Sequence, residues 1–370
     1  MKVAILTFHR SRNCGAMLQA YATCRTLRKM GHEVAFPDCS GKRYSDWEPL
    51  TRKGLSGWKA VSFFFHQVAL NLLSIGFNRE APALYEAFAD RWFPRSELKP
   101  QEFVGKFDAA VIGSDQVWSP RLTGKRWSIY TGKRVPDGVR LVSYAASCGD
   151  TIPKDRRFRA LRDALRRFSG VSVREQVLHD KLAESWGIPS TIVVDPSLLL
   201  SAEDYAPAIS TDLVPNEPYI LVFYVRSPEF PCKVARYLAK RMKMKVILAP
   251  GRLRSRLGKP KGALLGLSPD RFLGLFANAQ AVVASSFHAT AFSLIFRKPF
   301  VALQNGKATM GSRAESLLQS LGLADRFILR KPDLEGIVAR LSEPIPPSAY
   351  EKLDELKGRS LDWLRNSLEA

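Results

Sequence analysis

The sequence predicts an α/β protein with two lobes, each built around a mostly parallel β-sheet. The chain has 370 residues, which suits two domains of roughly 150 residues or a little more. Short apolar runs alternate with helical patterns along its length, and this alternation is typical of βαβ units. The composition, with 46% hydrophobic and 25% charged residues, is that of an ordinary globular protein. Disordered, collagen-like and small disulfide-rich proteins are therefore excluded.

The first lobe is expected over residues 1–165. An apolar run at 3–7 predicts a buried strand. The next segment, 15–30, has Met17 and Tyr21 on one side and Gly31 as its stop, and it predicts a helix. Three further strands are predicted at 33–37, 107–112 and 140–145. Because these strands are separated by helical segments, we expect them to be parallel and covered on both faces.

A helical insertion is expected within this lobe at about residues 45–100. Its segment 58–77 is apolar and long enough to raise the question of a membrane span, but Gln67, Asn71 and Ser74 form a polar stripe at helical spacing. We therefore predict an amphipathic helix, and prefer packing on a core to a position in a membrane interface. A second helix is predicted at 81–92.

The second lobe is expected over residues 166–345 and repeats the strand–helix alternation. The tail at 346–370 carries leucines at helical spacing and is expected to pack back toward the first lobe. The predicted strands are 170–173, 191–194, 219–225, 245–249, 281–284 and 300–303, and the helices between them are 174–186, 231–242, 269–277 and 290–296.

The chain is strongly basic, with 56 Lys and Arg against 35 Asp and Glu and a formal net charge of +21. Such a charge attracts anions, and it leaves peripheral contact with an anionic membrane surface open. Nucleic acid is not expected as a partner, because the basic stretch 226–261 lacks interleaved aromatics and a known binding motif. The five scattered cysteines indicate a reducing, cytoplasmic setting, and the N-terminus lacks the pattern of a signal peptide.

The candidate ligand-binding residues lie in loops that follow the predicted strands. In open α/β sheets, ligands bind beyond the carboxyl ends of the strands. After the first strand, the loop containing Asn13 and Gly15 opens a helix, a suitable place for anions or hydroxyl-rich ligands. After the strand at 107–112 come Asp115, Gln116 and Trp118. Asp115 could accept a proton from a sugar hydroxyl and Trp118 could stack on a sugar, but a simple capped turn fits equally well.

Two later loops carry a cation and a titratable group. Arg174 stands at the end of a strand, where it could clamp a phosphate or carboxylate, or pair with a neighbouring acid. His288 follows Ser285 and Ser286 at a strand-to-helix turn, and it is the best general acid/base candidate among the five histidines, with His9 second. A structural role for His288 is the alternative.

Several common sites are not supported by the sequence. No cluster of His, Asp, Glu or Cys has the spacing of metal ligands, so no metal is expected. Neither GxSxG nor GxGxxG occurs, which argues against a hydrolase triad and a dinucleotide dehydrogenase.

The ordered set of motifs resembles the polysaccharide pyruvyl transferase family. The resemblance runs from the N-terminus to about Phe327. It rests on the segments 5–9, 18–22, 113–118, 143–147, 172–175, 195–199, 286–288 and 321–323, together with Asn13, Gly15, Gly149, Phe292, Ser293, Ser312 and Arg313.

This resemblance implies two Rossmann-like lobes of GT-B-like arrangement with a cleft between them. It also implies transfer of pyruvate from phosphoenolpyruvate, a co-substrate, to a sugar of a surface polysaccharide or its lipid-diphosphate-linked precursor, as a cyclic ketal and with no cofactor. The residues it assigns are His288 and Asp115 to catalysis; Arg174, Arg313 and Ser286 to the donor; and Asn13, Gly15, Gln116 and Trp118 to the acceptor.

The chain departs from the family pattern at three positions, where Ala289, Gly311 and Cys14 replace the usual residues. A Cβ atom at 289 narrows the approach to the backbone. An altered acceptor or a weakened site therefore stays open. The alternatives to pyruvyl transfer are a GT-B-like glycosyltransferase that uses a nucleotide sugar, and a non-catalytic sugar- or lipid-binding protein of the same fold.

Overall fold

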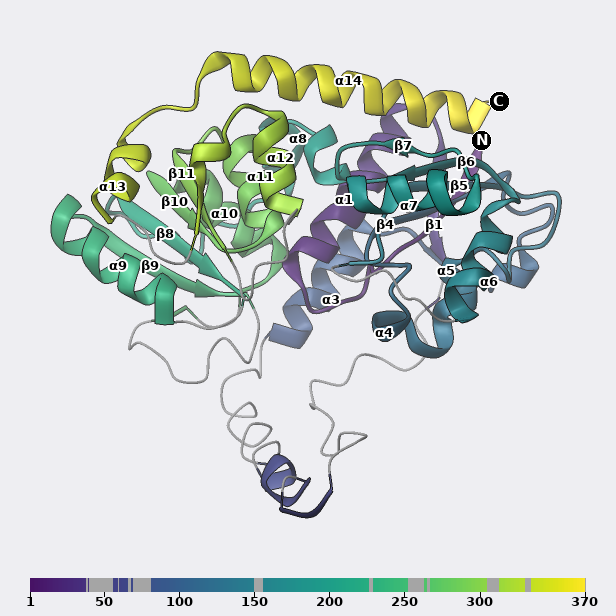
Figure 1. Cartoon of the computed structure of the whole chain (residues 1–370), viewed down its shortest axis with the longest axis horizontal. Coiled ribbons are helices and arrows are strands. Elements are labelled where there is room, and N and C mark those ends of the chain that lie inside the picture. Colours follow the sequence, from purple (N-terminus) through teal and green to yellow (C-terminus); the bar gives the residue numbers. More distant parts are fainter. Residues whose placement is uncertain are drawn as a thin grey trace.

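The structure is a computed structural model of the whole chain. It describes residues 1–37, 39, 56–58, 60–65, 68, 81–149, 156–225, 229–251, 263–264, 267–304, 313–329 and 334–369. Within these ranges the chain forms two α/β lobes that lie side by side, with a long C-terminal helix running across both (Figure 1). The predicted fold class, two Rossmann-like lobes with mostly parallel sheets, is confirmed.

The first lobe contains a seven-stranded sheet in the order β3-β2-β1-β4-β5-β6-β7. All of its neighbouring strands are parallel. The chain builds outward from β1 on one side and then on the other, so the switch point lies between β1 and β4. The strands are β1 (Lys2–Leu6), β2 (Glu33–Pro37), β3 (Arg95–Ser96), β4 (Ala109–Asp115), β5 (Arg140–Ala146), β6 (Phe168–Val173) and β7 (Thr191–Ile192).

The second lobe contains a five-stranded parallel sheet in the order β12-β11-β10-β8-β9. Its switch point lies between β8 and β10. The strands are β8 (Tyr219–Tyr224), β9 (Lys245–Pro250), β10 (Ala281–Ala284), β11 (Phe300–Leu303) and β12 (Phe327–Ile328).

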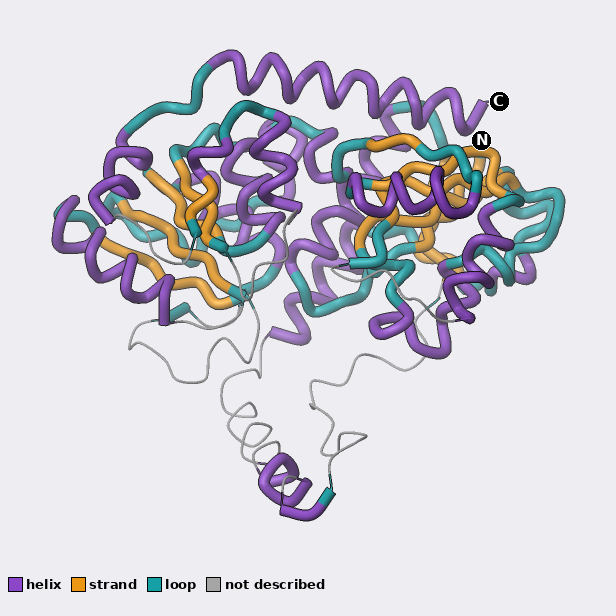
Figure 2. The backbone as a smooth tube through the Cα atoms, viewed as in Figure 1, coloured by secondary structure: helices purple, strands orange, loops and turns teal. Residues whose placement is uncertain are grey.

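Helices cover both faces of each sheet (Figure 2). Alternate residues of a strand enter different cores: Val3 and Ile5 join one hydrophobic cluster, while Ala4 and Leu6 join another. This double burial explains why the strands read as continuous apolar runs. The longer helices are α1 (Cys14–Lys29), α3 (Ala81–Trp92), α6 (Arg156–Leu165), α7 (Gln176–Trp186), α9 (Glu229–Met242), α10 (Pro269–Asn278), α11 (Phe287–Ile295), α12 (Arg313–Ser320) and α13 (Leu334–Ser342).

The two lobes meet along α1. This helix packs against α10 of the second lobe and against the connecting turn η3 (Pro196–Leu199). One hydrophobic cluster continues through this contact and includes Met17 from the first lobe and Phe292 from the second. The C-terminal helix α14 (Pro347–Glu369) contacts β5, β6 and η3, and the hydroxyl of its Ser360 accepts a hydrogen bond from the Val194 amide at 3.1 Å. The lobes are therefore held together at two places.

The structure differs from the predicted organisation at the domain boundary. The strands β6 and β7, which were expected to begin the second lobe, are the last two strands of the first sheet. The boundary predicted at residues 165–166 is therefore too early. Sequence periodicity identifies a strand but does not say which sheet it joins, and Lys/Arg-rich helix sequence near this point belongs to α6, on the surface of the first lobe.

The predicted amphipathic helix at 58–77 falls largely outside the described residues, as do Gly311 and Ser312. Of this segment, residues 58, 60–65 and 68 are described and helical. Trp58 is 86% exposed and Phe65 is 65% exposed, so these residues do not pack on a core as expected. Among the described helices, none is both long and apolar enough to cross a membrane.

Candidate active site

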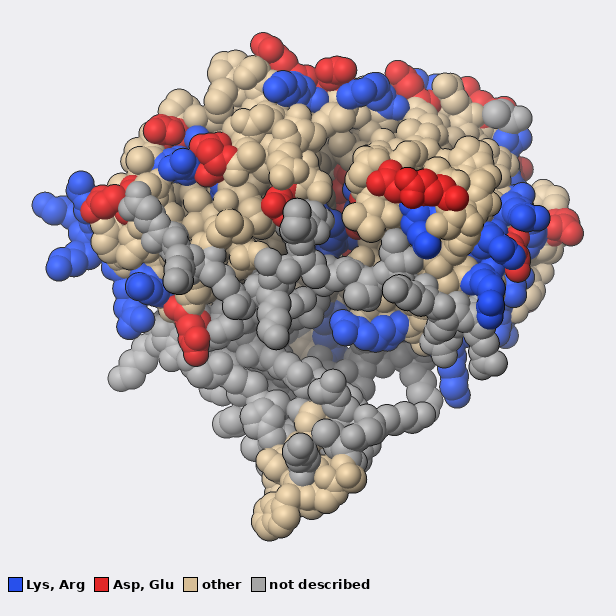
Figure 3. All heavy atoms as spheres, viewed as in Figure 1, with Lys and Arg blue, Asp and Glu red and all other residues tan. Residues whose placement is uncertain are grey.

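The candidate site lies where the carboxyl ends of strands from both sheets face each other. A groove separates the two lobes in the space-filling view, with acidic and basic atoms inside it (Figure 3). The first lobe supplies Asp115 at the end of β4, Arg174 after β6, and Asp195 after β7. The second lobe supplies His288 at the start of α11 and Arg313 at the start of α12. The first-lobe residues lie at or after strand ends, and the second-lobe residues lie at the first turns of helices. Ligands bind in such places in open α/β sheets.

The loop after β4 is held in an unusual backbone conformation. Gly113 has a φ of 124°, and a Cβ atom there would overlap the carbonyl oxygen of Tyr144. Asp115 has a φ of 68°, in the left-handed region that few residues with side chains adopt. Residues in such conformations persist where the surrounding structure enforces them, often at functional sites. Here the turn directs the Asp115 carboxylate toward Arg174.

Arg174 forms ion pairs with three acidic side chains. Its side chain is 3% exposed, and its Nη1 donates to Asp195 Oδ2 at 2.6 Å. Nη2 donates to Asp115 Oδ1 at 3.2 Å, and Nε donates to Glu175 Oε1 at 3.1 Å. Burial alone would lower the pKa of Arg174, but the three carboxylates raise it. In this structure Arg174 therefore adopts the ion-paired arrangement that its sequence position left open.

Asp195 is the most deeply buried acid among the ion-pair partners of Arg174. Its side chain is fully buried, and its Oδ1 accepts hydrogen bonds from the amide and hydroxyl of Ser197 at 3.1 and 2.7 Å. The hydroxyl of Ser114 donates to Asp195 Oδ2 at 3.0 Å. Burial would raise the pKa of Asp195, yet the charges of protonated His288 and of Arg174, with the bonds from Ser197, lower it to about 2. Asp195 is therefore an ionised fixed charge at neutral pH.

His288 faces this network from the second lobe. Its Nε2 lies 4.0 Å from Asp195 Oδ1 and has no hydrogen-bond partner among the described residues. Burial lowers the pKa of the His288 imidazole, and the positive charges of Arg174 and Arg313 lower it further. The carboxylates of Asp195 and Asp115 act in the opposite direction, but the net effect is a lowered pKa. The neutral imidazole is therefore the main form at pH 7.

Arg313 is the second group that lacks a close partner. Its Nη1 lies 4.0 Å from Asp115 Oδ1 and makes no hydrogen bond within the described part of the chain. Burial and the nearby charge of Arg174 lower the pKa of Arg313. The Phe287 ring lies 5.6 Å from the Arg313 guanidinium and 5.7 Å from that of Arg174, within cation–π range of both. A cation held in this way is suited to receive an anion.

Gly15 allows His288 to sit in this position. The first turn of α1 runs so close to the imidazole that a Cβ atom on Gly15 would overlap the ring. Asn13 caps the same helix, and its Oδ1 accepts hydrogen bonds from the amides of Gly15 and Ala16 at 3.0 and 3.3 Å. Both residues were predicted to contact the acceptor. In the structure, Gly15 leaves room for the His288 ring, and Asn13 caps the helix that carries Gly15.

Ser286 caps the helix of the second lobe that carries His288. It is the N-cap of α11, and its hydroxyl accepts a hydrogen bond from the Ala289 amide at 3.2 Å. Ala289 is fully buried in the hydrophobic core, where its Cβ atom is accommodated. Ser286 thus fixes the first turn of the helix that carries His288.

The predicted role of Trp118 is wrong. Its side chain is fully buried, and its indole N–H donates to the Tyr130 carbonyl at 3.0 Å. A ring in the core of the first lobe cannot stack on a saccharide. Gln116, two residues earlier, is half-buried and lies against Gly149.

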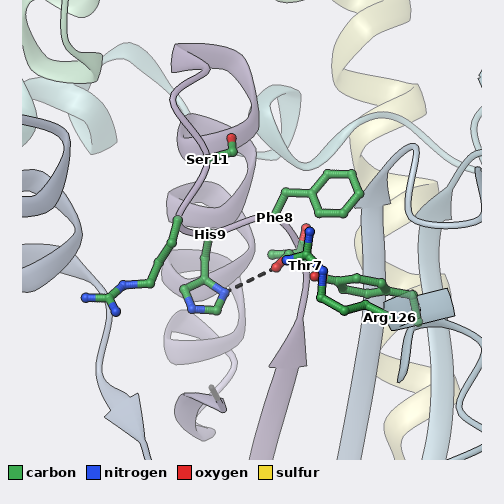
Figure 4. Close-up of a pocket in the computed structure, with 7 residues that line it drawn as sticks. Thr7, Phe8, His9, Ser11 and Arg126 are labelled. Carbon is green, nitrogen blue, oxygen red and sulfur yellow. Dashed lines mark hydrogen bonds between the residues drawn. The ribbon is translucent and has the colours of Figure 1, made fainter. Parts of the chain in front are cut away.

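A small pocket lies at the end of β1 in the first lobe (Figure 4). His9, the second histidine candidate, packs against Phe36 and Phe93 in its wall. Arg10 also lines the pocket and pairs with Asp90 at 3.5 Å. The full lining is Thr7, Phe8, His9, Arg10, Ser11, Arg126 and Tyr130.

Sequence reasoning assigned no site role to Asp195, Glu175 or Phe287. A signal for Asp195 was present, because it follows a predicted strand directly and precedes Pro196. Among the described residues, no group of three or more His, Cys, Asp or Glu side chains is placed to hold a metal ion.

The fold and the paired charges at the groove define a two-lobed α/β protein with a charged site between its lobes. Its fold resembles UDP-GlcNAc 2-epimerase from Methanocaldococcus jannaschii, with a TM-score of 0.51 and 12% identity over 93% of this chain and 92% of that one. A putative UDP-N-acetylglucosamine 2-epimerase from Listeria monocytogenes gives a TM-score of 0.50 and 9% identity, over 98% and 93%. A Streptomyces sp. SF2575 glycosyltransferase, SsfS6, gives 0.39 and 14% identity over 98% and 96%. At these identities the likeness concerns the fold alone.

The chain belongs to the polysaccharide pyruvyl transferase family. The sequence model of that family matches residues 13–307, which is well over half of the chain. No curated protein sequence matches the chain.

Proposed function

We propose that this protein transfers pyruvate from phosphoenolpyruvate to a saccharide of a surface polysaccharide or its lipid-linked precursor, forming a cyclic ketal. Family membership supports pyruvyl transfer to a polysaccharide. The observation that carries the donor assignment is the pair of buried nitrogen atoms, His288 Nε2 and Arg313 Nη1, which lack hydrogen-bond partners in the described structure. Phosphoenolpyruvate offers a phosphate and a carboxylate to such groups.

In the proposed reaction His288 protonates the methylene carbon of the donor. The central carbon then develops oxocarbenium character and is attacked by a sugar hydroxyl. The carbon–oxygen bond to phosphate breaks, and a second hydroxyl of the same sugar closes the ketal. The two hydroxyls together release two protons; one balances the proton gained by the methyl group and the other leaves on the phosphate. A positioned general acid of this kind typically contributes 10²–10⁴-fold to the rate.

The remaining residues have distinct parts in the proposal. Arg313 binds the donor anion directly, while Arg174 contributes positive charge and orients Asp115. Asp115 is the base that accepts the proton of the attacking hydroxyl, because its charge is maintained by Arg174 and Arg313: burial would raise the pKa of Asp115, but these guanidinium groups lower it. Gln116, whose side chain is half-buried, is the remaining candidate for contact with the acceptor.

The charges of the site imply that the donor binds together with a proton. The described site contains three carboxylates, those of Asp115, Asp195 and Glu175, against the two guanidinium groups of Arg174 and Arg313. His288 adds no full positive charge at pH 7, because its pKa is lowered. An incoming trianion adds further negative charge beside Nε2 of His288, which favours the imidazolium form. The donor thereby generates the acid that the reaction requires.

We also propose a cytoplasmic location, where phosphoenolpyruvate is available. The five cysteines, all among the described residues, are buried and form no disulfide, which suits a reducing compartment.

A thermal-shift titration tests the donor. Phosphoenolpyruvate, inorganic phosphate, UDP-sugars and GDP-sugars are compared on the purified full chain. At a ligand concentration of about 100 Kd, the expected stabilisation is roughly 2.7 kcal/mol. A shift with phosphoenolpyruvate but not with the nucleotide sugars is expected. A shift only with a nucleotide sugar would instead indicate a glycosyltransferase and remove the proposed role of His288.

A further inference from the structure

A short helical projection stands apart from both lobes and is apolar over much of its surface. It consists of residues 57, 58 and 60–65, which we call the helical knob. In Figures 1 and 3 it forms the tip at the bottom of the view, on the side opposite α14. Its large side chains are unusually open to solvent: Trp58 is 86% exposed, Phe65 65%, Val61 46% and Phe64 40%.

The exposed side chains form one broad apolar face. At about 100° per helical residue, Trp58, Val61 and Phe65 fall within about 60° of one another, and Phe64 widens the arc to about 120°. The other described members of the knob are small or aromatic, and none of them is charged. Monomeric proteins seldom leave such a face in water without a partner.

The charges around the knob in the sequence have one sign. From residue 49 to residue 79 the chain contains Arg52, Lys53, Lys59 and Arg79 and no Asp or Glu. The protein as a whole carries a net charge of +21. Exposed aromatic residues on a protein with this net positive charge suit the interface of an anionic bilayer, where the rings enter the acyl boundary.

A lipid surface fits the knob better than a protein groove does. Two turns of helix offer little area against the roughly 800 Å² that each partner buries in a standard protein interface. An exposed tryptophan such as Trp58 also suits the headgroup level, where such rings concentrate. Insertion needs no matching groove, only a projection that reaches the membrane before the rest of the molecule does.

We propose that the helical knob docks this protein on an anionic lipid bilayer. Trp58, Phe64 and Phe65 insert at the interface, and the net charge of +21 favours a bilayer with anionic headgroups. This role is independent of the donor chemistry: it would hold whichever donor the site uses, so the failure of one proposal does not decide the other.

Vesicle co-sedimentation of the full chain tests the docking. Vesicles of phosphatidylcholine alone are compared with vesicles of equal parts phosphatidylcholine and phosphatidylglycerol, at low and high salt. Wild type is expected to prefer the anionic vesicles. The triple variant Trp58→Ser/Phe64→Ser/Phe65→Ser is expected to lower this partitioning about tenfold or more, because it removes the apolar insertion.

A matched control places the same change on other exposed apolar positions. Val104, Val177 and Leu329 are 59%, 61% and 59% exposed, outside the knob. The variant Val104→Ser/Val177→Ser/Leu329→Ser is expected to bind vesicles like wild type. Thermal unfolding of both variants establishes that each is folded.

Brominated phosphatidylcholine in the anionic vesicles gives a local readout. It is expected to quench tryptophan fluorescence in wild type and to quench it much less in Trp58→Phe, which keeps an apolar ring. Three results would each overturn the proposal: no vesicle binding by wild type, equal binding by the knob variant, or a lipid-independent change of oligomeric state in that variant. The last result would identify a second copy of the chain as the occupant.

Discussion

The two lobes contribute opposite kinds of residues to one site. The first lobe provides Arg174, Asp195 and Asp115, whose polar atoms are already bonded to each other and to neighbouring serines. The second lobe provides His288 and Arg313, each with a buried nitrogen that has no hydrogen-bond partner among the described residues. The polar atoms from the first lobe are thus paired with one another, whereas one nitrogen of each second-lobe residue is not paired within the described structure.

This difference separates a scaffold from a binding surface. A buried cation surrounded by carboxylates is costly to disrupt, since removing it leaves buried charges uncompensated. A buried donor without a partner carries a desolvation cost that a ligand can relieve. We therefore expect substitutions of Arg174 or Asp195 to affect stability most, and substitutions of His288 or Arg313 to affect activity most.

The largest effect on activity is expected for His288→Gln. Loss of the proton donor should lower kcat about 10²–10⁴-fold, while the unfolding temperature stays near that of wild type because Nε2 makes no hydrogen bond within the described structure. Pyruvyl transfer to an accepted saccharide, followed by NMR of the ketal methyl group, measures the loss. Undiminished turnover would return His288 to a structural role.

Replacing Arg174 and Arg313 one at a time tests this difference between the lobes most sharply. Arg174→Gln should destabilise the fold by about 3–5 kcal/mol, because Asp195, Asp115 and Glu175 lose their shared cation. Arg313→Gln should be near neutral for stability and should weaken phosphoenolpyruvate binding, because it removes a cation whose nearest acid is 4.0 Å away. Chemical denaturation and calorimetric titration of both variants give the two quantities. Equal stability losses would show that the lobes do not differ in this way.

A smaller effect is expected for the dependence of stability on pH. The pKa of His288 is lowered by burial in the folded protein, whereas the unfolded value is about 6.5. Between the two values the unfolded chain binds the extra proton, so the stability present above about pH 6.5 is lost as the pH falls through the folded value. His288→Gln should lack this part of the decline in the unfolding temperature between pH 8 and pH 5.

Asp195 provides an internal check on this pH range. With a pKa of about 2 it stays ionised from pH 8 to pH 5, so it contributes nothing to the decline. An identical pH profile for wild type and His288→Gln would mean that the histidine has the same proton affinity in the folded and unfolded states. Calorimetry in two buffers of different ionisation enthalpy should also detect proton uptake when phosphoenolpyruvate binds to wild type.

Most of the strands could be predicted because parallel strands are buried on both faces and therefore read as apolar runs. Most of the longer helices could be predicted as well. The run at 281–284, for example, is apolar throughout and coincides with β10. Pairing could not be predicted in the same way, because β6 and β7 have the same apolar pattern whichever sheet they join. Short edge strands such as β3 and β12 have two residues each, too few for a pattern.

The site was predicted in part for a related reason. Rules about strand ends placed Asp115, Arg174 and His288 near one groove, and the structure brings them together. The same rules could not tell that Trp118 points into the core, because a turn residue gives no information on the direction of its side chain. Nor could they show that Gly15 faces His288, since that contact joins residues of different lobes.

The contact between Gly15 and His288 also imposes an order on evolutionary change. While the imidazole is present, a larger residue at position 15 would displace it, so selection for the histidine is also selection for the glycine. A lineage that loses the histidine is released from this restriction. Once alanine or serine is established at position 15, the return of histidine is blocked, and two mutations are needed where one would have sufficed.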